Sequence, residues 1–199
     1  ILWIQREIGF VGDYALKSIS PLNGYSRNFK ENLLEEVVGM EVISIATSVE
    51  NKDFLNKQLI EIFDLELPVP GKSHLTSNGL SRLLGLSLDQ WLIVSVDQKY
   101  ELKALLENSL SNKSYVTLQT DAWVCIRISG RSALKALERI CPVNLDPDLF
   151  LKDYIARTMM EHLGSIVICE NPNSYLLMSA SSSAKSFLHA LEVSLRNVI

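Results

Sequence analysis

Residues 127–146, with the sequence RISGRSALKALERICPVNLD, combine features of an anion-binding turn with those of a reactive thiol. A strand-like run ends at Gly130, Arg131 follows, and a helix-like segment ends at Cys141, directly before a proline. The free N–H groups at a helix N-terminus can hold an anion, and Gly130 and Arg131 would lie near them. In the alternative, Gly130 permits a tight turn, Ser132 caps the helix and Cys141 faces the core. The stretch lacks the second glycine and the Gly-Lys-Ser/Thr tail of a phosphate-binding loop, so we expect the second arrangement.

The other nucleotide-binding patterns in the sequence are incomplete. Gly71-Lys72-Ser73 matches the tail of a phosphate-binding loop, but Glu66 stands where the first glycine is needed. The sequence contains no GxGxxG, so it has no dinucleotide fingerprint. We therefore expect no cofactor-binding residues in this chain.

Three cysteines, Cys125, Cys141 and Cys169, are the candidate nucleophiles. Their wide spacing and odd number fit neither a disulfide framework nor a zinc site. A free cysteine often behaves as a small hydrophobe, so we expect all three to be buried or inert, in a protein of the reducing cytoplasm. A Cys–His nucleophile pair remains open only if Cys125 or Cys141 meets a histidine in the folded chain.

The histidines and the paired carboxylates give no recognisable site. His74, His162 and His189 lie far apart and form no HxxxH or HExxH pattern, so we expect no metal ligands. Asp146 and Asp148 flank a proline, and paired carboxylates can do acid–base chemistry. The Asp-Pro-Asp spacing is more typical of a turn. We expect no catalytic residues.

Two tryptophans, Trp91 and Trp123, lie within segments that we expect to be strands. Buried aromatic packing is the expectation for both side chains. Stacking of either indole on a base or a pterin is the alternative.

Composition sets the class of protein. The 199 residues are 47% hydrophobic and 21% charged, with a net charge of -4, which is typical of a soluble globular domain. No basic stripe interrupts this acidic background, which argues against nucleic acid as a partner. The apolar runs, such as WLIVSV at 91–96, are too short to span a bilayer. The N-terminal ILWIQREIGFVGDYALK lacks the basic region and cleavage site of a signal peptide.

The elements that would position these residues follow from hydrophobic periodicity. We expect helices within residues 51–67 and at 98–110, 132–141 and 184–198, and a loop at 68–74. Strands are expected at 40–49, 88–96, 114–120, 122–129, 156–163, 165–170 and 174–180. The order of strands and helices is βαβα, then ββα, then βββα. It predicts an α+β fold in which helices pack on one face of a largely antiparallel sheet.

Several motifs recur in an order that resembles the gamma subunit of heterotetrameric sarcosine oxidase. The first is Ser-Pro-Leu at 20–22, and the second is GLSLDQWLIV, which has glutamine where the family usually has an acid. The run TDAWVCIRISGRSALKALERICPVNLDPDLF, the pair Arg157-Thr158 and the closing SASSSAKSFLHAL complete the resemblance. It covers about residues 20–195. It implies an N-terminal extension at 1–19 and a gamma-like domain at 20–199, with 20–112 and 113–199 as candidate subdomains.

This resemblance implies a fold similar to the folate-binding domain of the glycine-cleavage T-protein. It also implies a complex of alpha, beta, gamma and delta subunits that oxidises sarcosine to glycine and hydrogen peroxide. With tetrahydrofolate present, the one-carbon unit leaves as methylenetetrahydrofolate. FAD, FMN and NAD would belong to alpha and beta, and zinc to delta. This chain would then be a non-catalytic subunit that docks on alpha through a large apolar patch.

Two alternatives remain open. One is a stand-alone folate-binding or aminomethyltransferase-like protein. No cysteine here is preceded by Lys-Gly, which argues against the iron–sulfur-assembly relatives of the T-protein. The other is a Cys-dependent enzyme, which would need Cys141 exposed near a histidine.

Overall fold

The computed structural model describes residues 18–96, 101–110 and 113–199, which form two antiparallel sheets and four α-helices. The first sheet has the strand order β1 (Ser26–Phe29), β2 (Asn32–Glu36), β8 (Trp123–Ser129), β11 (Ser174–Ala180), β10 (Leu163–Asn171) and β9 (Ile155–Met160). The second has the order β4 (Ser73–Leu75), β5 (Ser81–Gly85), β6 (Gln90–Ser95), β3 (Glu41–Thr47) and β7 (Ser114–Leu118). The helices are α1 (Lys52–Phe63), α2 (Leu102–Leu110), α3 (Ala133–Glu138) and α4 (Ala184–Arg196).

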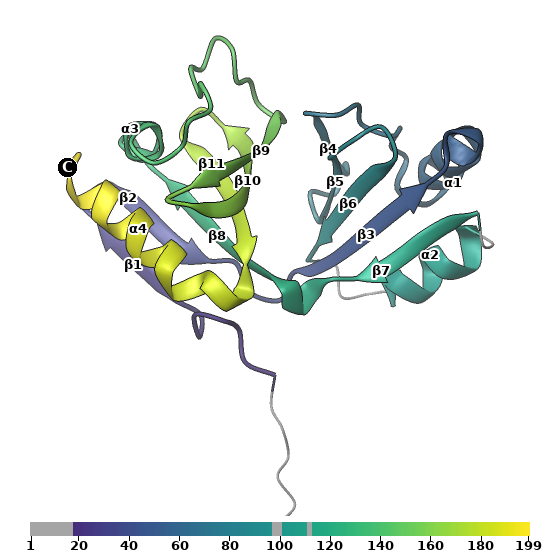
Figure 1. Ribbon diagram of the computed structural model, residues 1–199, viewed down its shortest axis with the longest axis horizontal. Helices are drawn as coiled ribbons and strands as arrows, with labels where there is room; N and C mark the ends of the chain where they lie inside the picture. The colour runs from purple at the N-terminus through teal and green to yellow at the C-terminus, as the bar shows by residue number, and fades with distance from the viewer. Residues whose placement is uncertain (1–17, 97–100, 111–112) are drawn as a thin grey trace, which may run out of the picture.

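The elements stack in four layers. Figure 1 shows the two sheets beside one another, with α3 and α4 outside the first sheet and α1 and α2 outside the second. Successive side chains of a strand point to opposite faces, so a strand between two layers must be apolar on both. In β8, Val124 and Ile126 pack toward α3 and α4, whereas Cys125 packs between the sheets. The expected α+β fold with helices on one face of each antiparallel sheet is confirmed.

One end of the interface between the sheets is joined by backbone and side-chain bonds. The N–H of Ile155 donates to the Gly71 carbonyl at 2.9 Å, and the N–H of Ser73 donates to the Asp153 carbonyl at 2.7 Å. The Arg82 guanidinium, from β5, donates to the Asp153 carboxylate and to the Ser73 hydroxyl. Arg82 is 5% exposed, so its charge is paired inside the interface rather than in water.

The Ser-Pro-Leu segment folds around a buried carboxylate. Glu36, at the end of β2, is 7% exposed. It accepts bonds from the Ser20 hydroxyl at 2.7 Å, the Leu22 N–H at 3.0 Å and the Gly24 N–H at 2.7 Å. A carboxylate has enough lone pairs for all three donors, so Glu36 fixes the turn at which the described chain enters the first sheet.

We expect Glu36→Gln to lower the free energy of unfolding by about 1–2 kcal/mol, because an amide nitrogen cannot accept and at least one donor loses its partner. Urea denaturation measures this loss, and hydrogen exchange at Leu22 and Gly24 should accelerate. Glu35→Gln is the matched control, since the Glu35 side chain is 30% exposed and pairs with Arg127 at 3.4 Å. Its loss should stay below about 0.5 kcal/mol. Equal losses in the two variants would contradict the role of Glu36.

Four strands are absent from the sequence-based prediction. β1 and β5 are short and carry polar or glycine residues, and two of the five residues of β2 are glutamates. β4 overlaps the end of the segment 68–74, which we expected to be a loop. The expectation that His162 lies in a strand is also wrong. Glu161 and His162 both have positive φ and form the two-residue turn between β9 and β10. β1 and β2 join the same sheet as β8–β11; the division into subdomains stays a prediction.

The expected helices are present with slightly shorter bounds. The strand expected at 174–180 has those bounds as β11, and the others differ by a few residues at their ends. Residues 98–100 of the second expected helix, and residues 1–17 of the expected extension, lie outside the described part of the chain. None of the described helices is long and apolar enough to cross a membrane.

Candidate functional site

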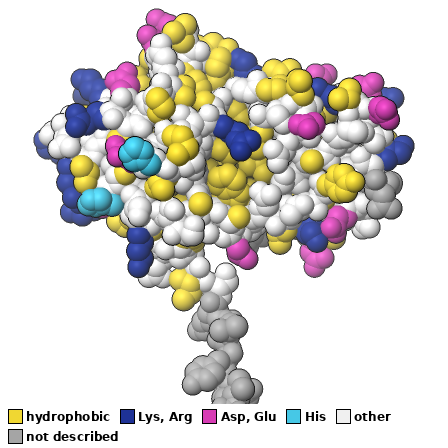
Figure 2. All heavy atoms as spheres, viewed as in Figure 1, with side chains coloured by type: hydrophobic (Ala, Val, Ile, Leu, Met, Phe, Trp, Pro, Cys, Tyr) yellow, Lys and Arg dark blue, Asp and Glu magenta, His cyan; other side chains and the backbone are white. Residues whose placement is uncertain are grey.

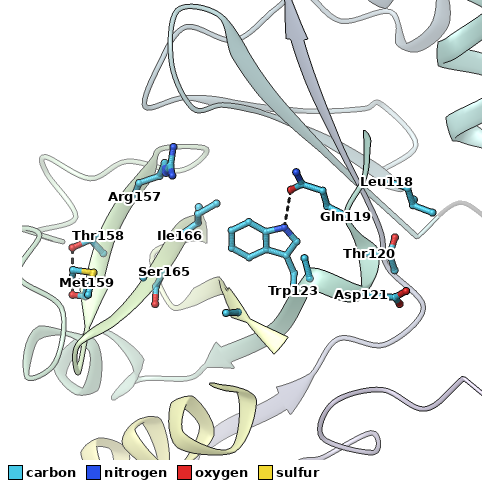
Figure 3. Close-up of a pocket in the computed structure, with 13 residues that line it drawn as sticks. Leu118, Gln119, Thr120, Asp121, Trp123, Arg157, Thr158, Met159, Ser165 and Ile166 are labelled. Carbon is cyan, nitrogen blue, oxygen red and sulfur yellow. Dashed lines mark hydrogen bonds between the residues drawn. The ribbon is translucent and has the colours of Figure 1, made fainter. Parts of the chain in front are cut away.

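A hollow of about 860 Å³ lies where the chain passes from one sheet to the other. The 3-10 turn at Thr120–Ala122 follows β7 of the second sheet and leads into β8 of the first, so Trp123 begins β8 at the junction. Figure 3 shows the Trp123 ring at the centre of the hollow, with its indole N–H donating to the Gln119 side-chain oxygen at 3.3 Å. Trp123 is half-buried, so part of its ring is open to a ligand or a partner.

The opposite wall of this hollow comes from β9 and β10. Arg157 and Gln119 lie on opposite sides of Trp123 (Figure 3). Arg157 follows Ile155 by two residues, so its side chain shares the face of β9 that looks toward the second sheet. It is exposed and forms no ion pair within residues 18–96, 101–110 and 113–199. At Gly164, which also lines the hollow, a Cβ would meet nothing within 4 Å.

A second hollow, of about 930 Å³, adjoins the first at Trp123. Residues 18–21 and 36–42 line it, and it shares Leu118, Thr120, Asp121 and Trp123 with the first. We call the two hollows together the Trp123 groove. Asp121, where the two hollows meet, and Glu41, in the second hollow, supply acidic side chains, and burial raises the pKa of the Glu41 carboxyl. The groove is therefore apolar at its centre, basic toward β9 and acidic toward β3.

The turn at 129–132 is a structural unit, as expected. Gly130 has φ of 120°, and its N–H donates to the Asn173 carbonyl at 2.9 Å. The N-terminus of α3 is occupied by the Asn32 side chain, whose oxygen accepts from the Ser132 N–H at 2.8 Å. Ser132 itself makes no capping bond through its side chain, so the capping expected of it is wrong. Arg131 is exposed and pairs with Glu31 at 3.4 Å. These contacts leave no anion site at this turn.

Gly71-Lys72-Ser73 is likewise a structural connection. The Gly71 carbonyl accepts from β9, and both the N–H and the hydroxyl of Ser73 donate to the Asp153 carbonyl. The segment therefore joins the two sheets rather than forming a phosphate-binding loop.

The paired carboxylates and Trp91 also have structural roles. The Asp148 N–H donates to the Asp146 carboxylate at 2.9 Å, and the Asp146 N–H donates to the Asn144 side chain at 3.0 Å. This local bonding confirms the turn expected at 146–148. Trp91 is 1% exposed and donates to the Pro68 carbonyl at 3.0 Å, so buried packing is confirmed for it. Trp123 is only partly buried, which leaves the stacking alternative open for that residue alone.

All three cysteines are buried and unpaired, which confirms the expectation for Cys141. Burial raises the pKa of Cys125 to about 12 and raises the pKa of Cys141 and Cys169 above that of a free thiol. In the described part of the chain no hydrogen bond joins a cysteine to a histidine, and His162 and His189 are exposed. No group of three His, Cys, Asp or Glu among these residues could hold a metal ion.

We expect none of Cys125, Cys141 and Cys169 to react rapidly with Ellman's reagent in the native protein near pH 8. The thiolate is the reactive form, and a raised pKa together with burial reduces both its population and its access. All three thiols should react after unfolding in guanidinium chloride, which serves as the control. Rapid, stoichiometric labelling of Cys141 in the native protein would contradict this assignment.

Two antiparallel sheets packed face to face, each with helices on its outer side, are the fold of the T-protein type. The chain is similar to a chain in the structure of heterotetrameric sarcosine oxidase from Corynebacterium sp. U-96 in complex with pyrrole 2-carboxylate. The TM-score is 0.79 at 16% identity, over 91% of this chain and 96% of that chain. The resemblance expected from the sequence is thus confirmed for the fold.

A second similar structure is glycine cleavage system aminomethyltransferase T from Bartonella henselae. The TM-score is 0.59 at 13% identity, and the likeness covers 78% of this chain but 44% of that chain. No family model matches the sequence, and no curated protein is similar enough in sequence to match it.

The sequence analysis did not predict that Trp123 and Arg157 line the same hollow. The available signal was the alternation in β9, where Arg157 stands between two residues that point to the opposite face. Placing that face against the end of β7 requires the pairing of both sheets, which no local pattern encodes.

Proposed function

We propose that this chain is a non-catalytic subunit of a heterotetrameric sarcosine oxidase, equivalent to its gamma subunit. The observation that carries the proposal is the extent of the structural likeness: it spans 96% of a chain of that heterotetramer, but only 44% of the aminomethyltransferase. The described fold therefore corresponds to nearly the whole of one chain of that heterotetramer.

Under this proposal the chain supports the oxidative demethylation of sarcosine to glycine, with hydrogen peroxide and methylenetetrahydrofolate as the other products. FAD, FMN, NAD, zinc and tetrahydrofolate would be held in or between the alpha, beta and delta subunits, in the cytoplasm. The alpha subunit is the proposed direct contact. The part of this chain that the structure describes would contribute packing surface rather than reacting groups.

Co-expression with alpha, beta and delta subunits of a sarcosine oxidase tests the proposal. We expect the full chain to co-purify with them in equal amounts, together with bound flavin and sarcosine-dependent release of peroxide. The control is the same expression without this chain, which should yield less assembled complex. Failure to associate, combined with micromolar binding of tetrahydrofolate by the chain alone, would overturn the subunit proposal.

A stand-alone folate-binding or aminomethyltransferase-like protein is the second candidate. The observation in its favour is the half-buried Trp123 ring beside the unpaired Arg157, because an indole face and a guanidinium suit a flat ring with a carboxylate. Calorimetry with tetrahydrofolate and the isolated chain tests it. Saturable binding that Trp123→Ala removes would support this candidate, and absence of binding would exclude it.

A further inference from the structure

We propose that the Trp123 groove is the docking surface for an extended segment of a partner chain. That segment is apolar in its middle, with an acidic group at the Arg157 end and a basic group at the Asp121 and Glu41 end. The inference rests on the proposed function for the identity of the partner, whereas the chemistry of the segment follows from the groove itself.

The apolar rim of the groove is the first argument. Four aliphatic or thioether side chains on its lining stand open to solvent: Ile19 is 71% exposed, Val38 53%, Leu118 49% and Met159 53%. Figure 2 shows hydrophobic side chains gathered in the middle of one face, beside basic side chains. A gathering of exposed apolar side chains around an aromatic ring is typical of a protein interaction site.

Charge complementarity is the second argument. Arg157 stands at one end without an ion-pair partner in the described chain. The carboxylates of Asp121, where the two hollows meet, and of Glu41, in the second hollow, also form no ion pair with the described residues. Unpaired charges of opposite sign at the two ends of an apolar groove favour a ligand with the reverse order of charges.

The free edge of β9 is the third argument, and it favours an extended segment. β9 pairs with β10 on one side. On its other side the first residue, Ile155, donates to the Gly71 carbonyl, and beyond it β9 has no partner strand in the described chain. Arg157, Thr158 and Met159, which line the groove, belong to this unpaired part. An edge strand presents unpaired N–H and C=O groups, and an added extended segment can satisfy them. Two adjoining hollows of about 860 and 930 Å³ also suit successive side chains of one segment better than a single compact ligand.

Assembly of the full chain with the alpha, beta and delta subunits gives the first test. Trp123→Ala and Arg157→Glu should each reduce the amount of co-purified alpha subunit by about tenfold or more, as expected for anchor residues of an interface. Arg139→Glu makes the same charge change at an exposed residue directly after α3, which does not line the groove, and it should assemble as the unchanged chain does. Equal urea midpoints for the variants would show that the fold is retained.

Photo-crosslinking in the same complex locates the segment. A benzoylphenylalanine at Met159 should crosslink to the partner, and mass spectrometry should identify a segment with an apolar core between an acidic and a basic residue. The same group at Val193, which is 40% exposed on the outer helix α4, should not crosslink.

Two fluorescein-labelled peptides test the groove without any partner subunit. Both have a Leu-Val-Leu core; one carries aspartate before it and lysine after it, and the other has the charges exchanged. The full chain should bind one order about tenfold more tightly than the other, and Arg157→Glu should remove that difference.

The outcomes separate the two proposals. If the complex forms but the variants at Trp123 and Arg157 assemble normally, or Met159 gives no crosslink, the docking surface is overturned and the subunit proposal stands. If no complex forms, but one peptide binds about tenfold more tightly than the other and Arg157→Glu removes that difference, the subunit proposal fails and the surface stands. If there is neither assembly nor peptide binding, both are overturned.

Discussion

Gly130→Ala should lower the free energy of unfolding by at least about 3 kcal/mol. An ideal Cβ at this position would lie 2.4 Å from the Glu31 carbonyl oxygen and 2.6 Å from the Asn32 side-chain oxygen. The φ of 120° is also unfavourable for any residue with a Cβ. Glu31 lies between β1 and β2, and Asn32 begins β2. Glu31 meets the new atom with its backbone, which cannot rotate away as a side chain can. Urea denaturation followed by circular dichroism measures the loss.

Two other glycines serve as controls that distinguish the two causes of the loss, the positive φ and the steric contact. Gly24 has φ of 70° but nothing within 4 Å of an added Cβ, so Gly24→Ala should cost only the backbone strain, about 1–2 kcal/mol. Gly164 has neither a positive φ nor a close neighbour, so Gly164→Ala should change stability by less than about 0.5 kcal/mol. A loss for Gly130→Ala no larger than that for Gly24→Ala would show that the neighbouring strands give way, and that the turn is not held by this close approach.

The turn at 129–132 shows which parts of the structure local sequence patterns can predict. The sequence predicts a strand, a glycine turn and a helix at 122–141, and these elements are present as β8 and α3. The group that caps α3 was not predictable, because Asn32 lies on β2, far along the chain. Alternating and helical patterns encode the faces of an element, but they do not encode which distant polar side chain satisfies its end.

The missed strands have a related physical cause. β5 reads SRLLG, and its buried Arg82 interrupts what would otherwise be an apolar run. That arginine is tolerated only because Asp153, from the loop before β9, supplies the opposite charge. A prediction based on hydrophobicity assigns such a residue to the surface, so it misses both the strand and its place in the interface.

The candidate site also depends on contacts between residues that are far apart in the sequence. Sequence analysis singled out each residue separately, Trp123 as a tryptophan in an expected strand and Arg157 as part of the pair Arg157-Thr158. Their proximity depends on the turn from β7 into β8 and on the position of β9 at the sheet edge. The groove is thus a product of the sheet order, and the whole-length structural likeness to a sarcosine oxidase chain concerns that order rather than individual residues.

Asp153→Ala is expected to lower the free energy of unfolding by about 3 kcal/mol, because it leaves the Arg82 charge buried between the sheets without a partner. The Arg82 side chain is 6% exposed and that of Asp153 is 35% exposed, so water can compensate the carboxylate more easily than the guanidinium. Arg82→Met should therefore cost less than Asp153→Ala, about 1–2 kcal/mol, since methionine retains much of the apolar stem.

The double variant decides between a charge effect and a packing effect. Arg82→Met with Asp153→Ala should lose less free energy than Asp153→Ala alone, because no unpaired charge remains in the interface. Asp153 has φ of 67°, a conformation that asparagine also tolerates, so Asp153→Asn removes the charge without the added strain of alanine. Its loss should fall between those of Arg82→Met and Asp153→Ala.

An exposed pair provides the comparison. The side chains of Arg131 and Glu31 are 85% and 68% exposed, so Glu31→Ala should change stability by less than about 0.5 kcal/mol. Additive losses for Arg82→Met and Asp153→Ala in the double variant would show that the two side chains do not act together. In that case the bonds from the Ser73 N–H and hydroxyl to the Asp153 carbonyl, rather than the ion pair, would hold this end of the two sheets together.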